Sequence, residues 1–240
     1  MGLCKKCRKV EVQPIDIGGG MQVTPPHCPV CVAKIHATRR RERFEAHVAK
    51  SGMPRELWTY SRSLGNPELL DWCVAHASDW IWLGGATRVG KTRALARTAV
   101  VDTWRREHWP SILWLESASF FGLLADRSHA ARAVAMERLD AAKHAELLLL
   151  DDIGMERLTD DTRAMLFSAI DYRFTRRLRT WFTSNANKDE LTAHIGAGRW
   201  PQIRARIAER GTIRTWAGEV WSETTTQVPE CAESYWWQDL

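Results

Sequence analysis

Two segments of the chain carry residue types at spacings that suit nucleotide chemistry, and the first is GATRVGKT at positions 85–92. It fits the phosphate-loop pattern GxxxxGK[ST]. Glycines let backbone N–H groups turn toward a β-phosphate, and the N-terminus of a following helix adds partial positive charge. The lysine then reaches the β- and γ-phosphates, and the threonine hydroxyl is a ligand for Mg²⁺. We therefore predict that ATP and Mg²⁺ are bound by Gly85, Ala86, Thr87, Arg88, Val89, Gly90, Lys91 and Thr92.

The second segment is LLLLDDIG at positions 147–154. A continuous apolar run predicts a strand buried on both faces, and open α/β sheets bind their ligands at the carboxyl ends of such strands. Taken alone, the segment also fits a core strand that ends in a solvated turn. Beside a phosphate loop, we predict that Asp151 holds Mg²⁺ and that Asp152 is the base that orients the attacking water. Because Asp is one methylene shorter than Glu, we expect slow hydrolysis.

Four cysteines near the N-terminus have the spacing of a metal site. Cys4 and Cys7 form one Cys-x-x-Cys pair, and Cys28 and Cys31 form another after 20 intervening residues. This spacing matches a structural Zn²⁺ site of the ribbon or finger type, with a hairpin between the pairs. Disulfides are the alternative, which a cytoplasmic protein disfavours. We predict a small zinc-ribbon-like domain, followed by a basic helix from about residue 36 to residue 50.

The elements that must position the nucleotide-binding residues alternate between strand and helix. Apolar runs predict strands at residues 80–83, 111–116, 147–151 and 178–184. Helical periodicity predicts helices at 91–106, 118–139 (mostly helical) and 159–176, the last with Thr159 as its N-cap. This alternation predicts an α/β fold with a doubly wound parallel sheet. Asn185 follows the last strand and is suited to contact a γ-phosphate or the attacking water.

The charge of the chain is unevenly distributed. The 240 residues carry a formal net charge of +5, and residues 1–50 hold ten Lys and Arg against four Asp and Glu. This excess suggests contact with nucleic acid or an acidic protein surface, and a solvated basic helix explains it as well. The chain shows neither a run of about 20 apolar residues nor a secretory signal. We expect a cytoplasmic protein with no membrane partner.

Several segments, in order, resemble those of the DnaC/DnaI/IstB-like AAA+ ATPases: SGMPRELW, GGATRVGKT, LLLLDDIG, AIDYRF, WFTSNANKDEL and IRARI. The resemblance covers about residues 51–218, and DDIG together with TSN is its most specific part. It implies a P-loop AAA+ fold in which Asn185 is the sensor I residue. The arginine finger of the family maps onto Arg206, with Arg204 as a close competitor. Such a finger enters the ATP site of a neighbouring subunit, so the resemblance implies assembly promoted by ATP, as a homo-oligomer or on a partner.

The sequence departs from the family pattern in three places. Ala205 replaces the serine that precedes the finger, and the arginine expected after Gly218 is missing. Only about 30 residues follow Arg210, too few for a full helical lid. Nucleotide binding should therefore depend on neighbouring subunits or on a partner protein.

Two kinds of family member have different partners. Helicase loaders bind the replicative DNA helicase through an N-terminal appendage, and in some loaders of the DnaI type this appendage carries zinc. Transposition helpers of the IstB type use a helical appendage instead. The cysteine pairs favour a loader that places the helicase on single-stranded DNA. A small-molecule P-loop kinase is a third alternative, in which the sensor and finger residues are accidental. The resulting division is a zinc-binding head with a basic helix (1–50), an AAA+ ATPase domain (51–218) and an acidic tail (219–240).

The chain contains 13 tryptophans, which suggest base stacking. Most lie in apolar runs, as do Trp80, Trp82, Trp114 and Trp181, and these we assign to the core. The segment at 119–121, which contains Phe120 and Phe121, is a candidate for contact with single-stranded DNA.

Overall fold

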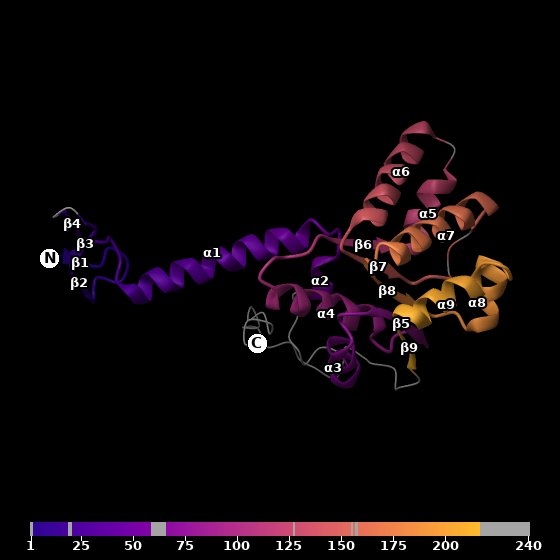
Figure 1. The fold of residues 1–240 in the computed structure, drawn as a ribbon, viewed down its shortest axis with the longest axis horizontal. Helices are drawn as coiled ribbons and strands as arrows, with labels where there is room; N and C mark the ends of the chain where they lie inside the picture. The colour runs from indigo at the N-terminus through magenta and orange to yellow at the C-terminus, as the bar shows by residue number, and fades with distance from the viewer. Residues whose placement is uncertain are drawn as a thin grey trace. The chain divides into compact units, whose positions relative to one another are not determined.

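Figure 1 shows the computed structural model, which describes residues 2–18, 21–58, 66–126, 128–154, 156 and 158–216. The chain forms two compact units, residues 1–47 and residues 48–240. Residues 219–240, expected to form an acidic tail, lie outside the described ranges. Within those ranges, no helix has both the length and the apolar character that crossing a membrane requires.

The first unit is organised by its cysteines. Strand β1 (Gly2–Leu3) pairs antiparallel with β2 (Glu11–Val12), and β3 (Ile15–Asp16) pairs antiparallel with β4 (Gln22–Val23). The hairpin expected between the two cysteine pairs is present as β3 and β4, and β1 and β2 form a second hairpin that encloses Cys4 and Cys7. The buried cluster of this unit consists of three cysteines and Val12. So small a cluster cannot stabilise a fold by apolar burial alone, which is the usual reason for a structural metal.

Helix α1 (Pro29–Ala49) starts seven residues earlier than the helix predicted from residue 36. Proline is favoured in a first turn because its missing N–H has no intrahelical partner there. Cys31 therefore lies in the first turn of α1, so the second cysteine pair is continuous with the basic helix.

The second unit contains a five-stranded parallel sheet in the order β6-β7-β8-β5-β9. The strands are β5 (Trp80–Gly85), β6 (Ile112–Glu116), β7 (Leu147–Asp151), β8 (Arg179–Ser184) and β9 (Gly211–Trp216). The predicted α/β fold with a parallel sheet is confirmed. β9 was not predicted, because its pattern, GTIRTW, lacks the apolar run of the other strands.

Helices cover both faces of this sheet (Figure 1). On one face, α2 (Arg55–Trp58) and α3 (Pro67–Ala75) pack on α4 (Lys91–Arg105), which contacts β7 and β8. The other layer consists of α5 (Ser117–Ala125), α6 (His129–His144), α7 (Asp160–Thr175), α8 (Lys188–Ile195) and α9 (Trp200–Arg210). The region 118–139 is thus two helices, because Ser128 caps a new helix by accepting from the Ala131 N–H. Thr159 is the N-cap of α7, as predicted.

Successive residues of each strand point to opposite faces of the sheet, so the strands contribute side chains to the core on both faces. Trp80, Trp82 and Phe182 belong to the cluster between the sheet and the layer of α5–α9. The four tryptophans assigned to the core are at most 7% exposed, which confirms that assignment. Phe120 and Phe121 belong to the same cluster and are 2% and 1% exposed. The prediction that they contact DNA is therefore wrong: the apolar side of α5 faces the sheet.

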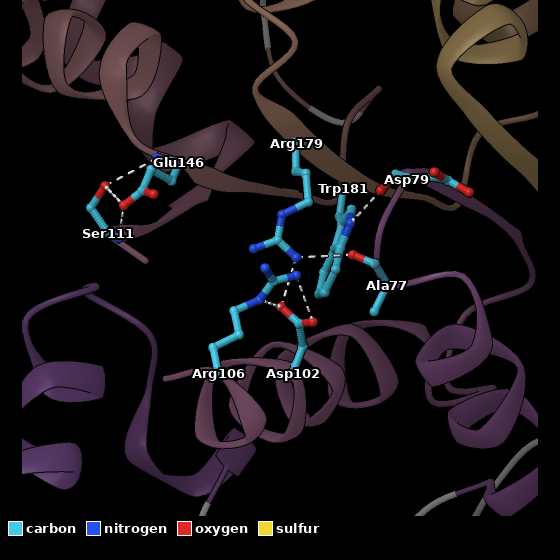
Figure 2. A network of polar contacts seen from close by, with 8 residues as sticks. All are labelled: Ala77, Asp79, Asp102, Arg106, Ser111, Glu146, Arg179 and Trp181. Carbon is cyan, nitrogen blue, oxygen red and sulfur yellow. Dashed lines mark hydrogen bonds and ion pairs between the residues drawn. The ribbon is translucent and has the colours of Figure 1, made fainter. Parts of the chain in front are cut away.

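Polar contacts tie the strands together at the edge where they begin (Figure 2). Arg179, the first residue of β8, donates to Oδ2 of Asp102 in α4 at 2.6 Å, and Arg106 also binds Asp102. Before β6 and β7, the Glu146 carboxylate accepts from the Ser111 N–H at 2.8 Å. These contacts fix the amino edge of the sheet, and the residues predicted to bind nucleotide lie at the opposite edge.

Candidate nucleotide and metal sites

The loop between β5 and α4 brings Lys91 into the centre of the predicted nucleotide site. Gly90 caps α4 with φ 89°, in the left-handed region that favours glycine. The Lys91 Nζ donates to the carbonyls of Gly85 (2.9 Å) and Ala86 (2.7 Å) and to Oδ1 of Asn185 (2.7 Å). Burial lowers the pKa of Lys91, and the nearby carboxylates Asp152 and Asp151 oppose that shift. The ammonium thus lies between the phosphate loop and the end of β8.

Asp151, the last residue of β7, is bound by two hydroxyl groups. Its Oδ1 accepts from Thr92 Oγ1 at 2.7 Å and from Thr183 Oγ1 at 2.6 Å. Burial raises the pKa of Asp151, and these two hydrogen bonds oppose the shift. A carboxylate and a threonine hydroxyl this close are the hard oxygen ligands that Mg²⁺ takes beside a phosphate. Thr92 and Asp151 therefore fit the predicted magnesium site.

Asp152 turns back toward the same centre. Its φ of 58° lies in the left-handed region, and its N–H donates to Thr183 Oγ1 at 2.8 Å. Its Oδ1 accepts from Asn185 Nδ2. Burial raises the pKa of Asp152, and the Lys91 ammonium opposes that shift. The structure thus brings Lys91, Thr92, Asp151, Asp152 and Asn185 together at the carboxyl edge of the sheet.

Two residues of this centre were not identified from the sequence. Thr183 binds both Asp151 and the backbone of Asp152, and it belongs to the TSN motif that supplied Asn185. Glu156 is buried, and its Oε2 accepts from the Gly154 N–H at 2.8 Å in the turn that follows Asp152. An acidic residue two positions after DDIG was the available signal for Glu156.

The two arginines considered as fingers lie differently on α9. Arg206 forms an ion pair with Asp171 of α7, and its guanidinium lies over the rings of Phe167 and Phe174. Arg204 instead lines a cavity of about 410 Å³ beside the phosphate loop, together with Ala86 and Asn185 of the same chain. These positions leave the assignment of a finger as a prediction.

The four N-terminal cysteines converge as the sequence predicted. Their Sγ atoms lie within 4.8 Å of one another, and Cys7 Sγ lies 3.9 Å from Cys28 Sγ. A tetrahedral Zn²⁺ with Zn–S bonds of about 2.3 Å needs sulfur atoms about 3.8 Å apart. The pKa of Cys4 is lowered to about 5, first by the backbone N–H groups of Cys7 and Cys28, which favour the thiolate. The cysteines therefore fit a Zn²⁺ site.

Comparison with known proteins finds similar chains among helicase loaders. No protein-family model matches the chain. The replicative helicase loader DnaI of Bacillus subtilis (strain 168) is 37% identical over 79 residues, which are 31% of this chain and 25% of that protein. The matched segment thus spans a quarter of that relative. A crystal structure of DnaI is 25% identical, with a TM-score of 0.51, over 68% of this chain and 94% of that one. In sequence and in fold, the chain is similar to the DnaC/DnaI-like AAA+ proteins.

Two further solved structures share the fold of this chain. The DnaC helicase loader is 18% identical, with a TM-score of 0.52, over 68% of this chain and 99% of that chain. A proposed primosome component from Streptococcus pyogenes serotype M3 is 21% identical, with a TM-score of 0.56, over 74% of this chain and 98% of that one. All three matched chains are covered almost completely, so the DnaC/DnaI-like fold is shared over most of their length.

Proposed function

We propose that the chain is an ATP-dependent replication factor that binds a replicative DNA helicase and loads it onto single-stranded DNA. One observation carries this proposal: the hydrogen-bonded centre that joins Lys91, Asn185 and Asp152 and, beside it, Thr92 and Asp151. A relative of similar sequence is named as a replicative helicase loader. In this proposal, residues 1–50 bind the helicase, residues 51–218 bind and hydrolyse ATP, and residues 219–240 form an acidic tail.

Each residue of the centre has a proposed role in ATP hydrolysis. Residues 85–92 hold the phosphates, with Lys91 on the β- and γ-phosphates, and Thr92 and Asp151 hold Mg²⁺. Bound Mg²⁺ neutralises charge that develops on the phosphates. Asp152 orients the attacking water and accepts its proton, and Asn185 contacts the γ-phosphate or that water. We propose slow turnover, since the Asp152 side chain is short and the amide of Asn185 occupies one of its oxygens.

ATP acts in this proposal as an assembly switch, either between copies of the chain or on the helicase. Arg206 is the proposed finger across a subunit interface, and Arg204 competes with it. Zinc held by the four cysteines is structural and keeps the docking head folded. An IstB-type transposition helper is the second candidate, and the cysteine cluster favours the loader over it.

Two single substitutions should separate the functions. Lys91→Ala should weaken ATP binding about 10- to 100-fold, because a buried cation on the phosphates is lost, yet leave capture of the replicative helicase of the same organism intact. By elemental analysis the parent should carry about one zinc per chain, and Cys4→Ser should lose it and abolish helicase capture while ATP binding stays normal. Cys73→Ala, a buried thiol outside the cluster, is the control. If Cys4→Ser loses zinc and still captures the helicase, docking by the head is wrong.

A further inference from the structure

Helix α1 carries its charges on separate faces. With 100° between successive residues, the positions of His36, Arg39, Arg40 and Arg43 fall within an arc of about 100°. We call these four residues the α1 stripe. All four side chains are exposed. The stripe contains three arginines and no acidic residue, so it is positively charged at any pH at which the protein is folded.

The opposite face of α1 carries charges of both signs. It contains Lys34, Arg41 and Glu45, and Glu42 lies midway between this face and the stripe. Arg41 Nε donates to Glu45 Oε1 at 2.7 Å, one turn away, which uses that arginine within the helix. A helix that was basic only for solubility would not need this separation. The segregation of charge is therefore a specific feature of α1.

We propose that the α1 stripe is a binding site for the phosphate backbone of nucleic acid. Arginine suits this ligand because its guanidinium can donate two parallel hydrogen bonds to a phosphate. At about 1.5 Å per residue, the stripe is about 10 Å long, which along the axis of a duplex is the length of about three phosphates of one strand at ~3.4 Å each. It can therefore follow a backbone over several nucleotides.

An acidic protein surface would be the other class of partner for a basic helix. Protein–protein interfaces have cores that are depleted in charge and enriched in aromatic residues, whereas interfaces with nucleic acid are strongly positive and polar. The four residues of the stripe include no aliphatic or large aromatic side chain, and no other residue between positions 36 and 43 falls within its arc. This composition favours nucleic acid.

The inference rests on the proposed function only for its biological role: in a helicase loader, such a site would hold single-stranded DNA along α1 while the cysteine-rich residues before α1 hold the helicase. Phosphates of single and double strands present the same chemistry. The test therefore includes both an oligo(dT) strand and a duplex of equal length, with the full chain, with and without Mg–ATP.

The decisive measurement is the salt dependence of binding. Arg39→Ala/Arg43→Ala should weaken binding of the oligo(dT) about 10-fold at low salt. The slope of log affinity against log salt concentration should become shallower by about 1.4, because two phosphate contacts are lost at ~0.7 each. Lys34→Ala/Arg41→Ala removes the same charge from the opposite face and should change the slope little. Arg39→Lys/Arg43→Lys should keep most of the slope.

Three outcomes would overturn the proposal. Equal losses in the two Ala pairs would mean that only net charge matters. Binding of neither oligo(dT) nor duplex by the parent chain at low salt would exclude the site, and ATP binding and helicase capture would be unaffected by that result. Loss of helicase capture in Arg39→Ala/Arg43→Ala, with DNA binding unchanged, would identify an acidic protein as the partner. Zinc content measured in parallel shows that each variant has a folded head.

Discussion

Asp151 and Asp152 are two adjacent carboxylates in a partly buried place. Burial raises the pKa of both, which means that their ionised forms are less favourable in the folded chain than in water. A carboxyl group of this kind stabilises the fold below its unfolded pKa, and that contribution is lost as the pH rises through its folded value. At neutral pH the pair is therefore a cost to stability that a bound cation offsets.

The first prediction at this scale concerns Asp151→Asn. Without nucleotide, the variant should melt about 2–4 °C above the parent at neutral pH, the effect of about 1 kcal/mol in a protein of this size. The gain should vanish at acidic pH, where the parent carboxyl is also neutral. Mg–ATP should stabilise the parent and have little effect on the variant, because the metal ligand is gone. Melting curves at several pH values measure both effects.

Asp126→Asn is a suitable control for that experiment. Asp126 is exposed, and the backbone N–H of Ser128 lowers its pKa, so its ionised form is favoured in the fold. Its replacement should not raise the melting temperature at neutral pH and should leave the response to Mg–ATP intact. A higher melting temperature in both variants would mean that net charge, and not the buried pair, decides stability.

The sequence predicted which residues meet at the nucleotide site but not how they contact one another. Lys91, Thr92, Asp151 and Asn185 each belong to a recognisable pattern at the end of a helix or strand, so the sequence predicted both their role and their position. It did not predict the role of the Thr183 hydroxyl, since in the sequence Thr183 is one more residue of an apolar strand. Only the register of β8 beside β7 places it level with Asp151.

At the scale of elements, two glycines explain how β9 joins the sheet. A Cβ on Gly85 would lie 2.1 Å from the Trp216 carbonyl oxygen, and one on Gly211 would lie 1.8 Å from that of Trp80. Each glycine therefore permits a close approach between β5 and β9. Such a requirement depends on a neighbour that is more than a hundred residues away, which is why this strand could not be predicted from its local pattern.

Arg173 gives the prediction at this scale. It is completely buried in α7, and its guanidinium donates to the carbonyls of Ala142 (2.6 Å) and Ala145 (2.7 Å) and to Thr180 Oγ1 (2.8 Å). It thus satisfies the last carbonyls of α6 and joins that end to β8. Arg173→Ala should lower the free energy of unfolding by about 3 kcal/mol, because these buried acceptors lose their donors and a cavity forms.

Denaturant unfolding measures this loss, with Arg176→Ala as the control. The Arg176 side chain is exposed and its guanidinium lies over the ring of Tyr172, so its loss should cost less than about 0.5 kcal/mol. Comparable losses in both variants would show that α6 does not depend on the Arg173 contacts.

At the scale of the whole molecule, the prediction concerns assembly. Arg206 is the proposed finger, yet it is bound within its own chain to Asp171 and two phenylalanine rings. Loss of activity in Arg206→Ala could therefore arise within the chain or across an interface. Asp171→Asn separates the two causes, because it weakens the internal ion pair and leaves the arginine in place. ATPase activity should fall at least about 10-fold in Arg206→Ala and stay near that of the parent in Asp171→Asn.

Mixing two inactive variants then tests the interface directly. Lys91→Ala binds ATP weakly but retains Arg206, whereas Arg206→Ala binds ATP but lacks the finger. If Arg206 acts on a neighbour, mixed assemblies pair an intact ATP site with an intact finger, and the mixture should regain ATPase activity that neither variant shows alone.

Arg204→Ala mixed with Lys91→Ala is the parallel experiment. Arg204 lines the cavity beside its own Ala86 and Asn185, so a role within its own site predicts no recovery in that mixture. Recovery with Arg204→Ala and none with Arg206→Ala would reverse the assignment, because the arginine that complements between chains is the one that crosses the interface.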